Sequence, residues 1–190
     1  MGQVASTSGT QDFSLGSIAR QTNFTKEELI KFRQAFMEIA AKSPEIGDTV
    51  ISQEQFGEML ALVEVPASNA SFMSLLFNAF DKNGDGFVNF VEFTAGLSMV
   101  LKGTPQEKYQ LCFEIYDVKK TGYITKPEMR QVLASMNLVL RASESSNRGY
   151  TNDDLDAFVT KIFSEGGQPE KLSFDDFIGQ VSKHPELVDF

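Results

Sequence analysis

The sequence contains few of the residues on which several functions depend. Of 190 residues, one is cysteine, one is histidine and none is tryptophan. Cys112 cannot form a disulfide within the chain, and its apolar neighbours Leu111 and Phe113 favour a buried, reduced thiol in a cytoplasmic protein. The histidine, His184, has no evident nucleophile or dyad partner, and we expect it at the surface or at a helix end. An enzyme is therefore the least favoured class.

Basic residues and long apolar runs are also scarce. The 17 Lys and Arg against 26 Asp and Glu give a net charge of -9, and no basic cluster is present that could displace counterions from phosphates. A nucleic-acid partner is therefore not expected. No run approaches the ~18 apolar residues of a membrane span, and the N-terminal segment lacks the charged start and apolar middle of a signal peptide. The 42% hydrophobic content indicates a globular protein.

One stretch, Asp81–Glu92, places oxygen-bearing side chains at the spacing that a calcium ion requires. Ca²⁺ takes roughly six to eight oxygen ligands, and a loop of about twelve residues supplies them from positions 1, 3, 5, 7, 9 and 12. Position 6 is Gly86, where the chain must turn sharply. The match to the pattern D-x-[DN]-x-[DN]-G-x5-E is complete. The predicted ligands are Asp81, Asn83, Asp85, the backbone carbonyl of Phe87, Asn89 directly or through water, and both carboxylate oxygens of Glu92.

A second loop, Asp117–Glu128, has the same outline with a different interior. It keeps acidic residues at its first and last positions and Gly122 at position 6, but Lys119 stands at position 3, where an oxygen ligand belongs. We interpret this loop as a structural one whose metal site is empty or weak. Its candidate ligands are Asp117, Thr121, Tyr123 through its carbonyl, and Glu128.

Three helix starts carry a capping box, in which a hydroxyl and a side chain three residues later satisfy each other's backbone N–H groups. They begin at Thr25, Ser52 and Thr104, the last with Pro105 at the first helical position. Ile51, Val88, Ile124 and Leu172 each precede by one residue a Ser, Asn or Thr that can cap a helix, which indicates an internal repeat.

The repeat predicts an all-α fold of four EF-hand helix-loop-helix units in two lobes. Short two-stranded β bridges would pair Ile51 with Val88 and Ile124 with Leu172. Loop 1, at 43–55, and loop 4, at 165–171, lack ligands, so neither should hold calcium. The predicted organisation is a flexible N-terminal arm at 1–23, a first EF-hand pair at 24–103 with hand 1 degenerate and hand 2 intact, a second pair at 104–184 with hands 3 and 4 degenerate, and a tail at 185–190.

The first residues, Met1-Gly2-Gln3-Val4-Ala5-Ser6, fit the pattern M-G-x-x-x-[ST], which exposes Gly2 for N-myristoylation. A single acyl chain binds a bilayer weakly and reversibly, and neither a basic patch nor a nearby cysteine adds a second anchor. We therefore expect a cytoplasmic protein with switchable, peripheral membrane contact.

With these motifs in place, the sequence resembles the EF-hand calcium sensors of the neuronal calcium sensor and calcineurin B superfamily. The segments 80–103, 107–109 and 116–129 are similar to the second and third hands of neuronal calcium sensors. The first six residues and the closing 182–188 are more like calcineurin B. The resemblance implies a myristoylated, mostly helical protein with an apolar groove for a helix of a target such as a kinase, phosphatase, cyclase or channel. Those families usually bind two or more ions, whereas this chain has one complete loop.

The favoured hypothesis is a calcium sensor and adaptor with one Ca²⁺ site, which uncovers Phe and Met side chains for a target protein when the ion binds. The alternative is a constitutive regulatory or scaffold subunit that carries one structural ion. A calcium buffer is less favoured because one site offers little capacity. In the tail, Leu187, Val188 and Phe190 are apolar enough to cover a groove.

Overall fold

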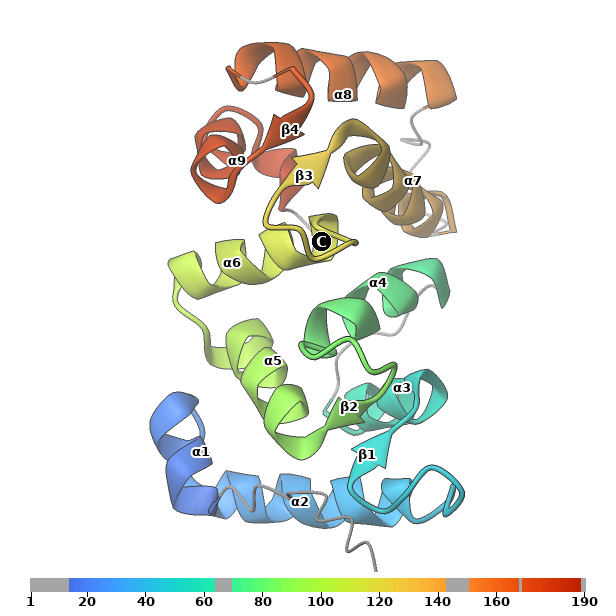
Figure 1. Ribbon diagram of the computed structural model, residues 1–190, viewed down its shortest axis with the longest axis vertical. Coiled ribbons are helices and arrows are strands. Elements are labelled where there is room, and N and C mark those ends of the chain that lie inside the picture. Colours follow the sequence, from blue (N-terminus) through green and yellow to red (C-terminus); the bar gives the residue numbers. More distant parts are fainter. Residues whose placement is uncertain (1–13, 64–69, 143–150, 168, 189–190) are drawn as a thin grey trace, which may run out of the picture.

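The computed structural model describes residues 14–63, 70–142, 151–167 and 169–188. Its helices and strands follow in the order shown in Figure 1: α1 (Leu15–Gln21), α2 (Lys26–Ala40), β1 (Val50–Ile51), α3 (Gln53–Leu62), α4 (Ala70–Phe80), β2 (Val88–Asn89), α5 (Phe90–Lys102), α6 (Pro105–Tyr116), β3 (Ile124–Thr125), α7 (Lys126–Ala142), α8 (Asn152–Glu165), β4 (Lys171–Leu172), α9 (Phe174–Val181) and the 3₁₀ helix η1 (Pro185–Leu187). None of the helices in these described ranges is both long and apolar enough to cross a bilayer.

The helices form four helix-loop-helix units, α2–α3, α4–α5, α6–α7 and α8–α9, joined in pairs by short antiparallel bridges. Strand β1 pairs with β2, with Ile51 opposite Val88, and β3 pairs with β4, with Ile124 opposite Leu172. The predicted all-α fold and both predicted bridges are therefore confirmed. The two pairs meet where α4 lies against α6 and α7 (Figure 1).

The helix starts follow from the capping residues. All three predicted capping boxes are present, at Thr25, Ser52 and Thr104. Asn89 and Ser173, which follow the repeat residues Val88 and Leu172, also begin helices with complete boxes. Because a box satisfies orphan N–H groups at each start, these short local patterns determine where the helices of each hand begin.

Rings from both hands of the first pair meet in its core. Phe56 of α3 packs edge-on against Phe77 and Phe80 of α4, with ring centroids 5.5 and 4.9 Å apart, and lies 6.2 Å from Phe93 of α5. Phe80 and Phe93 flank the loop between α4 and α5, and both are fully buried. Hand 1 thus supports the helices on either side of the Asp81–Glu92 loop.

The N-terminal arm differs from the expectation of a flexible segment through residue 23. Helix α1 begins at Ser14, whose side chain accepts a hydrogen bond from Ser17 N, and Ile18 is buried. Asn23 donates through its backbone N–H to Ser98 Oγ of α5 over 2.8 Å. The sequence around α1 is polar and gives little indication of a helix, but burial of the apolar side of α1 stabilises one. Gly2 lies outside the described residues.

The C-terminal segment packs against the body of the chain, with Leu187 fully buried. Within the tail predicted at 185–190, residues 185–187 form η1, and the buried Tyr116 hydroxyl donates to the Leu187 carbonyl over 3.0 Å. His184 sits at the predicted helix end, but it is buried rather than at the surface. Its ring lies edge-on to Phe158 of α8, so tertiary packing covers it. Helix α7 continues through Ala142, and residues 143–150 lie outside the described residues.

Candidate metal centre

The loop between α4 and α5 turns through two glycines in the left-handed region. Gly84 has φ 73° and Gly86 has φ 84°, conformations that an L side chain rarely adopts. Both turns wrap the chain around the Asp81 carboxylate, which accepts from Gly84 N over 2.7 Å and from Gly86 N over 3.0 Å. Asp81, at the end of α4, is buried. The first predicted ligand therefore lies at the centre of the loop.

The next two predicted ligands hold the exposed rim of the loop. Asn83 Oδ1 accepts from Asp85 N, and Asp85 Oδ1 accepts from Phe87 N, each over 2.9 Å. The amide of Asn83 also donates to Asp85 Oδ2 over 2.9 Å. These local turns bring the two side chains together on the open side of the loop.

Glu92 closes the loop from the first turn of α5. Its Oε2 accepts from Asn89 N over 3.0 Å, and its Oε1 accepts from the N–H groups of Lys82 and Asn83 over 3.1 and 3.2 Å. The carboxylate thus reaches from the last position of the loop back to its second and third residues.

Burial raises the pKa of Glu92 above its ordinary value, and the negative charges of Asp81 and Asp85 add to the increase, while backbone N–H donors act in the opposite direction. A buried carboxylate beside two others is costly to keep ionised without a compensating positive charge. The donor set therefore fits a hard divalent cation that prefers oxygen ligands.

Asn89 has a different role from the other predicted ligands. Its Oδ1 accepts from Val91 N over 2.9 Å and from Glu92 N over 3.0 Å, so the side chain caps α5. With that oxygen engaged, contact with an ion through water is the better fit of the two predicted arrangements. In the described part of the chain, no three His, Cys, Asp or Glu side chains converge tightly enough to enclose a metal by themselves, so the set must also use amide and carbonyl oxygens.

The Asp117–Glu128 loop has the same hydrogen-bond frame. Asp117 accepts from Thr121 N and Gly122 N over 2.9 and 2.7 Å, and Glu128 accepts from Lys119 N and Thr125 N over 3.1 and 2.9 Å. The Thr121 hydroxyl can donate its one proton to either of two acceptors, Asp117 Oδ1 at 3.3 Å or the Tyr123 carbonyl at 3.1 Å. Three of the four candidate ligands are thus engaged with one another.

Comparison with known proteins agrees with this architecture. The EF hand family profile matches residues 73–97, which contain the Asp81–Glu92 loop. A recoverin family protein of Dictyostelium discoideum is 31% identical over 187 residues, covering 90% of this chain and 81% of that protein. The chain belongs to the recoverin family. The calcium-binding protein NCSA of the same organism is 36% identical over 119 residues, covering 63% of this chain and 60% of that protein. The expected resemblance to neuronal calcium sensors is confirmed.

In this recoverin-family chain, hand 1 has a packing role that the sequence pattern did not indicate. Gln55, at the end of the predicted loop 1, is buried, and its Nε2 donates to the Ile39 carbonyl of α2 over 2.7 Å. Its Oε1 accepts from Ser52 N over 2.9 Å. The side chain therefore joins the two helices of the hand, a use that its capping-box position alone does not reveal.

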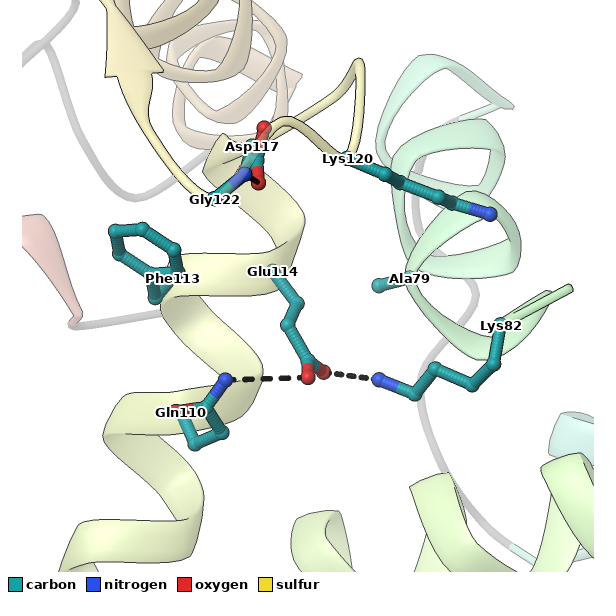
Figure 2. Close-up of a pocket in the computed structure, with 8 residues that line it drawn as sticks. All are labelled: Ala79, Lys82, Gln110, Phe113, Glu114, Asp117, Lys120 and Gly122. Carbon is teal, nitrogen blue, oxygen red and sulfur yellow. Dashed lines mark hydrogen bonds and ion pairs between the residues drawn. The ribbon is translucent and has the colours of Figure 1, made fainter. Parts of the chain in front are cut away.

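Side chains beyond the predicted ligands connect the two pairs of hands of this recoverin-family chain. Figure 2 shows the Lys82 ammonium paired with Glu114, whose carboxylate also accepts from Gln110 over 3.2 Å. Asn78 of α4 donates to the Val118 carbonyl over 2.9 Å. No short sequence pattern indicates the Lys82–Glu114 and Asn78–Val118 contacts, since each joins residues more than thirty positions apart.

Proposed function

We propose that this chain is a calcium sensor and adaptor in which Ca²⁺ binds at Asp81–Glu92 and changes the apolar surface offered to a target protein. The observation that carries the proposal is the position of Glu92, a buried carboxylate with a raised pKa that closes a loop containing Asp81 and Asp85. Three carboxylates in one short loop, joined by amide and carbonyl oxygens, would form a site for a divalent cation, because their negative charges repel one another in its absence.

Each residue has a defined part in this proposal. Asp81, Asn83, Asp85 and Glu92 would hold the ion through side-chain oxygens, Phe87 through its carbonyl, and Asn89 through water. When bound, calcium supplies the positive charge that the carboxylates lack. A loop of this kind is consistent with sensor-range affinity of roughly 10⁻⁷–10⁻⁵ M.

We further propose that this is the only calcium site. In the third hand, the hydroxyl of Thr121 engages Asp117 and the Tyr123 carbonyl, and Lys119 occupies a ligand position. A cation entering this loop would have to displace those bonds and approach a lysine. Hand 3 would then serve as a structural partner of hand 4, to which it is joined through β3 and β4.

Exposed apolar side chains on the first pair support a target surface there. Ile30 and Met37, seven residues apart on α2, are 55% and 38% exposed, and Leu62 at the end of α3 is 63% exposed. Residues at this spacing lie on one face of a helix. They belong to the same pair of hands as the intact loop, so a rearrangement of α4 and α5 would change their surroundings. The proposed partner is an amphipathic helix of a target protein.

One observation favours the second candidate, a constitutive subunit with one structural ion. Glu92 already bonds to N–H groups at both ends of its loop, so a metal would need little further closure of the hand.

A dye that fluoresces on apolar surface distinguishes the calcium sensor from the constitutive subunit. We expect its signal to rise with calcium in wild type and in Glu128→Gln, and to stay flat in Glu92→Gln. A flat wild-type titration, with calcium bound, favours the constitutive subunit.

The lipid part of the proposal rests on the sequence motif at Gly2, which lies outside the described residues. An acylated chain in the cytoplasm would associate reversibly with membranes. Co-sedimentation of acylated wild type with neutral vesicles, beside Gly2→Ala expressed with the same acyltransferase, is the test. Equal sedimentation of the two proteins rejects the acyl anchor.

A further inference from the structure

The third hand reaches the calcium loop through a lysine. Lys120, in the loop between α6 and β3, donates from its Nζ to the backbone carbonyl of Asp81. Figure 2 shows its side chain extending from that loop toward α4, apart from the Lys82–Glu114 pair. A cavity of about 250 Å³ lies at this junction, lined by Lys82, Glu114 and Lys120 among others.

The backbone conformation of Lys120 is unusual. Its φ is 55°, and it is the one non-glycine residue with a positive φ among the described residues. It occupies the fourth position of its loop, where the intact loop has Gly84 with φ 73°. A Cβ is crowded in this conformation, so a lysine here is less favourable than a glycine. The local pattern alone does not explain a lysine at this position.

The contact places a positive charge beside the acidic loop. Lys82 is neutralised by Glu114, whereas Lys120 makes no ion pair within the described ranges and bonds only to a neutral carbonyl. That carbonyl belongs to Asp81, whose carboxylate is the first ligand of the proposed site. The ammonium of Lys120 therefore lies beside the backbone of the first ligand, close enough for its charge to act on the acidic loop.

We propose that Lys120 is a resident counter-charge that sets the calcium affinity of the neighbouring hand. This inference rests on the proposed function of Asp81–Glu92. The ammonium stabilises the clustered carboxylates when the loop holds no ion, and it repels a divalent cation that enters. The third hand, in which Lys119 stands at a ligand position, thereby lowers the affinity of the second hand and stabilises its metal-free form.

Lys120 should weaken calcium binding and at the same time stabilise the metal-free chain. These opposite effects distinguish a counter-charge from a purely structural role. We expect Lys120→Gln to bind calcium about three- to tenfold more tightly than wild type by calorimetric titration of the full chain, and to melt at a lower temperature in chelator. Lys120→Arg keeps the charge and should behave like wild type. Lys119→Gln removes the same charge from the adjacent position and should change affinity less than about twofold.

Added salt provides a further check. The affinity difference between wild type and Lys120→Gln should shrink as ionic strength rises, because the repulsion is screened. Calcium binding to Lys120→Gln that is unchanged or weaker than wild type overturns the counter-charge while leaving the calcium site in place. If wild type binds no calcium at all, the proposed function fails, and the counter-charge fails with it.

Discussion

Replacing Gly96 by alanine tests the contact between the two helices of the second hand. Gly96 is buried in α5, and a Cβ at this position would lie 2.5–2.6 Å from three atoms of the Phe80 ring. That ring is fully buried and held by Phe56 and Phe93, with centroids 4.9 and 6.3 Å away, so it cannot swing aside. Overpacking of this kind costs ~1–3 kcal/mol.

Alanine also brings a gain, because its helix propensity exceeds that of glycine by ~1 kcal/mol. The clash should exceed this gain, so we expect Gly96→Ala to lower the free energy of unfolding by up to about 2 kcal/mol. For a chain of this size, that loss corresponds to a fall in melting temperature of up to about 8 °C. Urea unfolding in chelator measures the difference.

Gly179→Ala is the matched control. Gly179 lies in α9, and nothing comes within 4 Å of a Cβ built there. This variant should gain up to ~1 kcal/mol from helix propensity alone. In Phe80→Leu, the smaller side chain should make Gly96→Ala better tolerated, with a coupling of about 1 kcal/mol. A Gly96→Ala protein as stable as Gly179→Ala would refute the close-contact argument.

Three further predictions concern other contacts. Gln55→Ala should lose about 1–2 kcal/mol in urea unfolding, because it removes a buried hydrogen bond to the Ile39 carbonyl, which keeps its bond from Lys42 N, and also removes the acceptor for Ser52 N. Gln55→Glu should be no more stable than Gln55→Ala, because a carboxylate cannot donate to that carbonyl. A Gln55→Glu protein as stable as wild type contradicts this. Tyr116→Phe should lower the free energy of unfolding by about 1 kcal/mol and speed amide hydrogen exchange near Leu187, because it removes the hydrogen bond from the Tyr116 hydroxyl to the Leu187 carbonyl. Unchanged exchange rates would argue against that hydrogen bond. Hydrogen bonds, first of all from Lys102, lower the pKa of Glu28 from 4.5 to about 2. The stability that this gives is present above pH 4.5 and is lost as the pH falls toward 2. In Glu28→Gln, the free energy of unfolding should therefore fall less steeply between pH 4.5 and 2 than in wild type.

The Asp81–Glu92 loop was accessible from sequence because its determinants are local. Its spacing lies within a single turn-rich segment, and such a pattern specifies hydrogen bonds that form within the segment itself. The β bridges join segments far apart in the chain, and they could be predicted because the residue before a helix cap recurs in each of the four repeats. Both predicted pairs, Ile51 with Val88 and Ile124 with Leu172, are present.

What the sequence did not reveal depends on distant partners. Helix α1 is only seven residues long, and the polar composition around it predicts an arm; Ile18 orders it by packing against residues remote in the chain. The burial of His184 likewise requires α8 to lie across the C-terminal turn. Lys120 and its acceptor on Asp81 are 39 positions apart, so no short pattern could indicate their contact.

The ligand set stays a prediction, and the structure bears on one of its members. Asn89 fits the fifth of the six ligand positions, but its side-chain oxygen is engaged in capping α5. Sequence spacing identifies which residues surround an ion, whereas competition from backbone N–H groups determines which of them are free to contact it directly.

Calorimetric titration of the chelator-treated chain with calcium, wild type beside Glu92→Gln, tests the central claim most directly. A single site at Asp81–Glu92 predicts about one ion per chain for wild type and loss of binding in the variant, because Glu92 supplies both carboxylate oxygens at the last ligand position. Glu128→Gln should bind as wild type does. Calcium binding that persists in Glu92→Gln and disappears in Glu128→Gln would place a working site at Asp117–Glu128 and contradict the account.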